Sequence, residues 1–179
     1  MKKIIYSYIG NKHMRKFVDL LNDKYNWKPI AFLGRSYENN SIRKYYKDSI
    51  FMDSMDIRKT NFDYSKISKK IPIDEEIINN LSKYKHYYLE WLQDTTGWNF
   101  SIYERKRYFY EILTYWNSVI CDLKPDIYIS YTVPHMPAEY ALYLLCKHHF
   151  KIPTLFCDIT SYFDNSYFVI QGNLENLSE

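Results

Sequence analysis

His135 is the residue of this sequence best suited to acid–base chemistry, because it stands between Pro134 and Pro137 at the start of an expected helix. The prolines restrict the backbone, and the N–H groups at a helix start attract phosphate or carboxylate. The imidazole can donate a hydrogen bond to an anion or take a proton from a hydroxyl. Glu139 can orient the ring, so we identify His135 and Glu139 as candidate catalytic residues and Thr132 as a candidate substrate-binding residue. The alternative is that His135 only caps the helix or fills the turn.

Two other segments contain candidate substrate-binding residues, each at the end of an expected strand. The first is a turn and contributes Gly10, Asn11, Lys12 and His13. Its glycine lets the backbone approach a ligand, and its basic side chains can face an anion, but it matches neither the dinucleotide fingerprint nor the P-loop. The second contributes Asp158, which can bind a sugar or ribose hydroxyl. The alternatives are a solvated strand-to-helix turn and a carboxylate that caps a turn.

Metal and nucleophile chemistry have no support in the residue spacing. The three cysteines form no CxxC pair, and no HxxH, HExxH or GxSxG occurs. These spacings are the usual signatures of zinc sites and of activated serine nucleophiles. We therefore expect no metal site and three reduced thiols.

Length and composition favour one ordinary globular domain. The chain has 179 residues, of which 46% are hydrophobic and 25% charged, and its net charge of +3 is too small to indicate a nucleic-acid partner. The apolar runs are far shorter than the ~20 residues that span a bilayer. The apolar run after Met1 is too short for a signal peptide, so we expect a cytoplasmic location.

Basic and aromatic residues alternate in three stretches, at residues 43–47, 83–88 and 105–108. Such stretches can contact anionic lipid headgroups or stack on bases. More often they are amphipathic side chains that cover helix faces. A peripheral membrane contact at the inner face of the membrane is therefore one expectation, and nucleic acid is the weaker alternative.

The elements that position these residues follow from hydrophobic periodicity. The sequence predicts strands at residues 3–9, 27–33, 49–52, 126–131 and 154–158, with weaker strand character at 167–170. It predicts helices at residues 13–25, 74–95 and 138–149, and one that begins at the capping box of Ser101 and Glu104 and ends before Pro125. Pro29 favours an edge or an early position in its strand. Residues 53–70 are expected to form a polar connection.

Two β–α–β units are contained in this order, and such units have parallel strands in nearly all cases. The expected fold is therefore α/β, a Rossmann-like three-layer sandwich with a mainly parallel sheet. We expect a single domain over residues 1–170, followed by a polar tail at 171–179 that begins a linker. Ligands of such sheets bind at the carboxyl ends of the strands, where the candidate residues lie.

The C-terminal third resembles a known family. The pattern comprises residues 124–129 (KPDIYI), Pro134-His135, a helix at 140–150 and residues 152–154 (IPT). It is similar to the N-terminal half of bacterial capsule and lipopolysaccharide biosynthesis proteins with the GT-B glycosyltransferase layout. The specific likeness covers residues 124–158, and the order of elements agrees over residues 1–170.

This resemblance implies an acceptor-side domain that helps to transfer a sugar from a nucleotide sugar, as co-substrate, to a glycan or lipid-linked hydroxyl. A two-domain enzyme needs about twice this length. The donor site would then lie in a partner subunit or a downstream domain, with His135 and the turn at 10–13 facing the acceptor. Two alternatives remain: a Rossmann-like binding or scaffold module without catalysis, and a small stand-alone enzyme that binds a nucleotide or phosphosugar.

Overall fold

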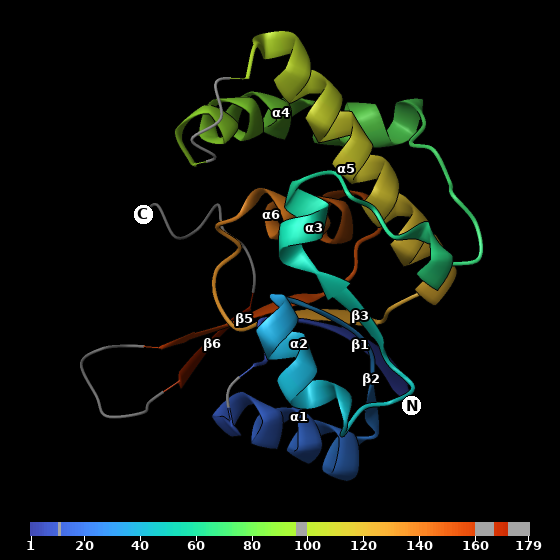
Figure 1. Ribbon diagram of the computed structural model, residues 1–179, viewed down its shortest axis with the longest axis vertical. Helices are drawn as coiled ribbons and strands as arrows, with labels where there is room; N and C mark the ends of the chain where they lie inside the picture. Colours follow the sequence, from blue (N-terminus) through green and yellow to red (C-terminus); the bar gives the residue numbers. More distant parts are fainter. Residues whose placement is uncertain (11, 96–99, 160–166, 172–179) are drawn as a thin grey trace. The chain divides into compact units, whose positions relative to one another are not determined.

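The computed structural model describes residues 1–10, 12–95, 100–159 and 167–171 (Figure 1). The chain divides into two compact units. The first, here called the sheet unit, comprises Met1–Met52, Pro125–Pro134 and Ile152–Glu179. The second, the helical unit, comprises Asp53–Lys124 and His135–Lys151. The tail expected at 171–179 lies outside the described residues from position 172 onward.

The sheet has six strands in the order β3-β2-β1-β4-β5-β6. Their bounds are β1 (Lys2–Ser7), β2 (Trp27–Gly34), β3 (Ile50–Asp53), β4 (Ile127–Ser130), β5 (Thr154–Ile159) and β6 (Tyr167–Gln171). The first five strands are parallel, whereas β6 runs antiparallel to β5. The Rossmann-like α/β fold with a mainly parallel sheet is therefore confirmed, and the weak strand signal near the C-terminus corresponds to β6.

One face of the sheet packs against α1 (Lys12–Tyr25), as the periodicity predicts. Met14, Val18 and Leu21 are the buried residues of this helix. They join a hydrophobic core with the alternate strand residues Ile4 and Tyr6, which point to the same face. The sequence predicts this packing because the helical spacing of α1 and the alternation of β1 each place apolar residues on one side, and these two sides face each other.

α2 (Ser36–Arg43) was not expected, because its sequence has no apolar stripe and buries only Asn39 and Ile42. Asn39 compensates with hydrogen bonds: its amide donates to the carbonyls of Gly34 at 3.2 Å and Met52 at 2.9 Å. It thus connects the ends of β2 and β3. Because Asn39 is buried by hydrogen bonding and not by apolar packing, α2 has no hydrophobic periodicity that would predict a helix.

Pro29 lies in an interior strand, so the edge placement is wrong and the early placement is correct. It is the third residue of β2, where the pairing with β1 shifts register between Ile4 and Ile5. Proline has no N–H to donate to a ladder. The irregular register at this point accommodates that loss.

The helical unit contains α3 (Ser54–Arg58), α4 (Glu75–Thr95), α5 (Ile102–Leu123) and α6 (Pro137–Leu144), with a 3₁₀ turn η1 (Tyr64–Lys66) and a π-helical turn η2 (Leu145–His149). The predicted capping box of α5 is confirmed, with Ser101 and Glu104 each accepting from the other's backbone N–H. The polar connection expected at 53–70 is wrong in part, because α3 and η1 form within it. The helix expected at 138–149 ends as η2.

Buried hydrogen bonds join the long helices to the start of α6. The Trp116 indole N–H donates to the carbonyl of Ala138 at 2.8 Å. The Tyr88 hydroxyl donates to the carbonyl of Pro137 at 3.0 Å. Because Trp116 and Tyr88 are both fully buried, these bonds fix α6 against α5 and α4. Among the described residues, no helix is long and apolar enough to cross a bilayer.

Candidate functional site

The carboxyl edge of the sheet is the first candidate site, because the expected substrate-binding residues follow its strands. Backbone hydrogen bonds hold this edge together: the Tyr131 N–H donates to Ser7 at 3.0 Å, and the Tyr8 N–H donates to Leu33 at 2.8 Å. Tyr8 has a φ of 59°, a left-handed conformation that is uncommon for a non-glycine residue. The ends of β1, β2 and β4 are thus fixed relative to one another.

Gly10 is required at this edge by a neighbouring helix. A β-carbon at position 10 would lie 2.6 Å from the Glu38 γ-carbon and 2.7 Å from its β-carbon. The Ser41 hydroxyl also donates to the Gly10 carbonyl at 3.2 Å. The close approach that the glycine permits is therefore made by α2, and the expected approach of a ligand stays a prediction.

The other predicted residues of the sheet unit are dispersed along this edge. Lys12 and His13 are exposed in the first turn of α1, and Thr132 is half-buried after β4. Asn11 lies outside the described residues. Asp158 belongs to β5 and pairs with Phe168 of β6, but its side chain is outside the described part of the chain.

His135 and Glu139 belong to the helical unit, in contrasting environments. His135 is exposed just before α6, whereas Glu139 in the first turn of that helix is 1% exposed. The negative charge of Glu139 contributes, after burial, to raising the pKa values of Tyr88 and Tyr108. Glu139 is therefore buried within the helical unit. Its expected role in orienting His135 stays a prediction.

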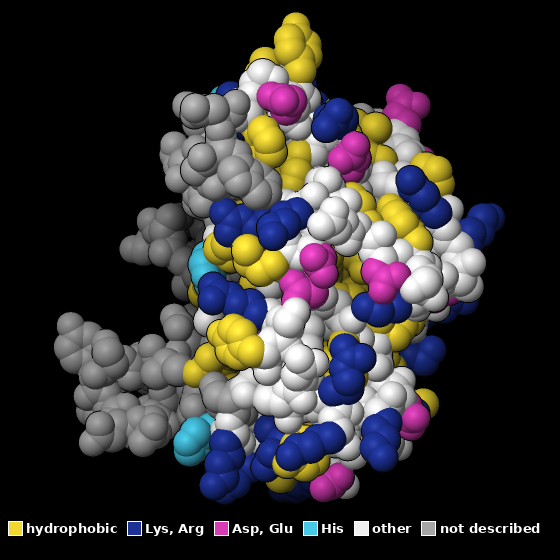
Figure 2. Space-filling view, viewed as in Figure 1, with side chains coloured by type: hydrophobic (Ala, Val, Ile, Leu, Met, Phe, Trp, Pro, Cys, Tyr) yellow, Lys and Arg dark blue, Asp and Glu magenta, His cyan; other side chains and the backbone are white. Residues whose placement is uncertain are grey.

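The basic and aromatic stretches contribute contacts within the protein. The Lys83 ammonium lies 4.6 Å from the ring centre of Tyr84, and the Lys85 ammonium lies 4.7 Å from that of Tyr110. On the face shown in Figure 2, Lys and Arg side chains lie beside hydrophobic ones at several places. These contacts agree with side chains that cover helix faces. The expected membrane contact stays a prediction.

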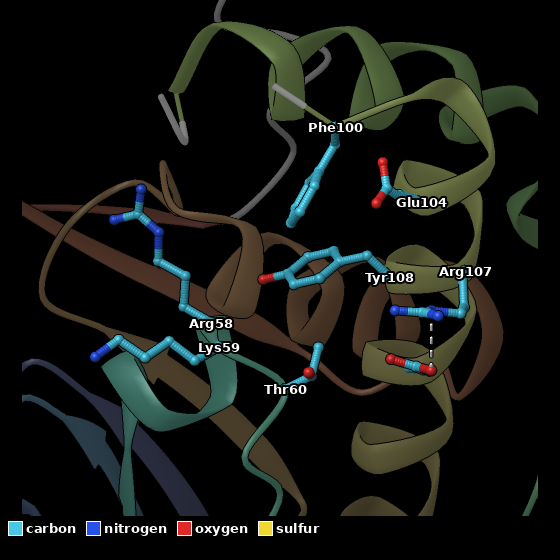
Figure 3. Close-up of a pocket in the computed structure, with 8 residues that line it drawn as sticks. Arg58, Lys59, Thr60, Phe100, Glu104, Arg107 and Tyr108 are labelled. Carbon is cyan, nitrogen blue, oxygen red and sulfur yellow. Dashed lines mark ion pairs between the residues drawn. The ribbon is translucent and has the colours of Figure 1, made fainter. Parts of the chain in front are cut away.

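The second candidate site is a pair of adjoining cavities on α5, within the helical unit. The first has a volume of about 500 Å³ and is lined by Arg58, Lys59, Thr60, Phe100, Glu104, Arg107, Tyr108 and Glu111 (Figure 3). The second has a volume of about 640 Å³ and is lined by Thr60, Phe62, Tyr64, Lys70, Arg107, Tyr110, Glu111 and Thr114. Thr60, Arg107 and Glu111 line both cavities. We therefore call the two cavities together the α5 groove.

The shared residues of the α5 groove include an ion pair. Arg107 Nε lies 3.5 Å from Glu111 Oε1, one helical turn away on α5. Both side chains are substantially exposed, so the pair itself stabilises the helix by well under ~1 kcal/mol. A guanidinium has five N–H donors, so Arg107 retains donors for a ligand while paired with Glu111.

Tyr108 connects the groove to the buried interior. Burial is the main cause that raises its pKa; the positive charge of Arg58 opposes the rise and the negative charge of Glu139 adds to it. The phenol is therefore protonated throughout the physiological range and carries an O–H donor. In Figure 3 the rings of Phe100 and Tyr108 point toward the side of the cavity that Arg58 and Lys59 line.

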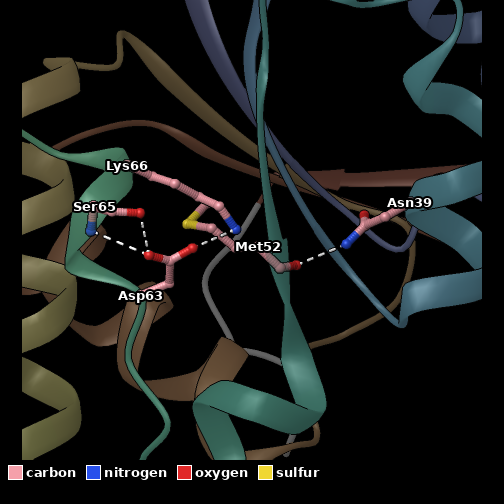
Figure 4. Close-up of polar contacts among 5 residues, drawn as sticks. All are labelled: Asn39, Met52, Asp63, Ser65 and Lys66. Carbon is pink, nitrogen blue, oxygen red and sulfur yellow. Dashed lines mark hydrogen bonds and ion pairs between the residues drawn. The ribbon is translucent and has the colours of Figure 1, made fainter.

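A local polar network fixes the wall of the groove that contains Phe62 and Tyr64. The Asp63 carboxylate accepts from the Ser65 backbone N–H at 3.1 Å and pairs with the Lys66 ammonium at 2.9 Å (Figure 4). Hydrogen bonds from Ser65 and Lys66 lower the pKa of Asp63 to about 2. The segment that follows this wall is tied to α5, because the Ile71 N–H donates to the Ser118 hydroxyl at 2.8 Å.

The sequence reasoning missed most of the α5 groove. Arg58, Lys59 and Thr60 lie in the segment 53–70, which the sequence predicts as a polar connection, and no spacing indicates that they lie near α5. Arg107 and Tyr108 do belong to a sequence pattern, the alternating basic and aromatic stretch at 105–108. Among the described residues, no group of three or more His, Cys, Asp or Glu could hold a metal ion.

Sheet order and strand direction define the class of this chain as a Rossmann-like α/β protein. Comparison with protein-family models, curated proteins and solved structures finds no match.

Proposed function

We propose that this chain is the acceptor-side part of a glycosyltransferase that builds bacterial surface polysaccharide at the cytoplasmic face of the membrane. One observation supports this above the others. The two β–α–β units have parallel strands, and β1 and β4 are neighbours in the sheet. The turn at 10–13 and Thr132 therefore follow adjacent strands, at the carboxyl edge where ligands of such sheets bind.

In this proposal His135 is the general base. Its imidazole takes the proton of the acceptor hydroxyl, whose oxygen then bonds to the anomeric carbon of the donor sugar. The bond from that carbon to the phosphate oxygen breaks, and the nucleotide leaves with the electron pair. The exposure of His135 supports this role because the ring is accessible to a substrate. The nucleotide sugar would be bound by a partner subunit or a further domain.

Genetic complementation tests the proposal in the organism that carries the gene. Deletion is expected to change the composition or length of the surface polysaccharide, and the wild-type gene is expected to restore it. His135→Ala is expected to be unable to restore it while accumulating to the wild-type level. His86→Ala is the matched control, because His86 is an exposed histidine paired with Glu90 on α4.

Two results would overturn the proposal. An unchanged polysaccharide after deletion would remove the transferase function. Full restoration by His135→Ala would remove the role of the imidazole and favour a binding module without catalysis.

A further inference from the structure

We propose that the α5 groove is a binding site for an acidic oligosaccharide. This binding does not require transferase activity, because the groove belongs to the helical unit and uses none of the candidate catalytic residues. The argument depends on the size of the groove, its aromatic surfaces and its balance of charge.

The size of the groove fits an extended ligand. Each cavity, at about 500 and about 640 Å³, is as large as an ordinary small-molecule site. Because Thr60, Arg107 and Glu111 line both, a ligand that fills one cavity can continue into the other. A chain of at least two sugar rings meets this requirement.

Aromatic side chains occur in both cavities. Phe100 and Tyr108 line the first, and Phe62, Tyr64 and Tyr110 line the second. The C–H faces of sugar rings pack against such apolar surfaces. Phe62 is held in place by stacking on buried Tyr115, with ring centres 4.9 Å apart and planes inclined by 17°. A fixed ring loses little conformational entropy when a ligand packs on it.

The charges of the groove favour a ligand that carries both negative groups and hydroxyls. Its lining has four basic residues, Arg58, Lys59, Lys70 and Arg107, and two acidic ones, Glu104 and Glu111. The basic side chains can pair with carboxylates, and the carboxylates can accept from sugar hydroxyls. An internal nucleotide of DNA has no O–H donor for these carboxylates, whereas every sugar ring of an oligosaccharide has hydroxyls. An acidic sugar chain is therefore the better match.

Binding is tested with the purified full chain and hexagalacturonate, an oligosaccharide with one carboxylate per ring, by titration calorimetry at low salt. Three comparison probes are maltohexaose, which has rings without charge; polyphosphate, which has charge without rings; and an oligothymidylate. We expect hexagalacturonate to bind most tightly and to weaken as salt is added.

Two pairs of variants locate the site. Arg107→Gln is expected to weaken hexagalacturonate by about tenfold, the effect of losing one charge-assisted hydrogen bond, whereas Lys106→Gln on the same helix is not. Phe100→Ala is expected to weaken it, whereas Tyr103→Ala, at a side chain 78% exposed that does not line the groove, is not. Circular dichroism of each variant checks that the helices are intact.

Three outcomes would overturn the proposal. The first is an absence of hexagalacturonate binding by the wild-type chain. The second is tighter binding of oligothymidylate or polyphosphate, which would indicate a nucleic-acid or purely electrostatic site. The third is equal weakening by both members of either pair. A negative result leaves the polysaccharide phenotype of the deletion unaffected, so the two proposals fail separately.

Discussion

Gly10 and Glu38 approach each other so closely that a β-carbon at position 10 would lie 2.6 Å from the Glu38 γ-carbon. The contact joins the turn after β1 to α2, and the Glu38 carboxylate also accepts from the Arg35 N–H at 2.7 Å. Glu38 therefore cannot move away without losing the cap of its own helix.

Replacement of Gly10 by alanine is expected to destabilise the chain. The added methyl group must displace the β- and γ-carbons of Glu38, and such overpacking costs about 1–3 kcal/mol. Urea unfolding measures the change in the free energy of unfolding. Gly34→Ala is the comparison, because its added methyl group would lie 3.0 Å from its nearest contact, Glu38 Oε2, and so requires a smaller displacement than the 2.6 Å approach at Gly10. If Gly34→Ala lowers the free energy of unfolding more than Gly10→Ala does, the close approach at Gly10 does not have the effect expected here.

Removal of the Tyr88 hydroxyl is expected to destabilise the helical unit. Tyr88→Phe leaves the ring in place but deletes the buried hydrogen bond to Pro137, which costs about 1 kcal/mol. The neighbouring Tyr87 is 66% exposed, so Tyr87→Phe is expected to leave the free energy of unfolding unchanged. Chemical denaturation of both variants makes the comparison, and equal losses would contradict it.

Asp63 is expected to make stability depend on pH in the acidic range. Its pKa of about 2 in the folded chain lies below the value of about 3.9 in an unfolded chain. Its contribution is therefore present above about pH 4 and is lost as the pH falls toward about pH 2. The effect is small because the carboxylate is exposed.

The measurement is the free energy of unfolding from about pH 5 to about pH 2, for the wild type and for Asp63→Asn. The variant is expected to lose less stability over this interval. Asp48→Asn removes another exposed carboxylate and is the control. Identical pH profiles for the wild type and Asp63→Asn would disprove the assignment.

Cys121 is expected to be the first thiol to react in the folded chain. Cys146 and Cys157 are buried, whereas Cys121 is partly exposed. Burial raises the pKa of all three thiols, that of Cys157 to about 11, so every reaction is slow at neutral pH. Kinetics with Ellman's reagent are expected to show one early phase. That phase should vanish in Cys121→Ser; its persistence would mean that another thiol is accessible.

Local sequence signals determined the strands and the longer helices of this protein, but not α2, α3 or η1. The apolar spacing of α1 and the capping box at Ser101 are properties of a few neighbouring residues, so they are visible in the sequence and confirmed in the structure. The parallel pairing of β1 with β2 and of β4 with β5 follows from the general geometry of β–α–β connections. These signals were sufficient for the fold class.

Tertiary structure alone decided the environment of individual candidate residues. Whether Gly10 meets a ligand or Glu38, and whether Glu139 is exposed or buried, depends on helices whose approach no local spacing encodes. The α5 groove arises in the same way, since Lys59 and Arg107 lie on segments distant in sequence that line one cavity. Packing between distant segments is fixed by the sum of many small contacts, and therefore only the folded chain brings these side chains together.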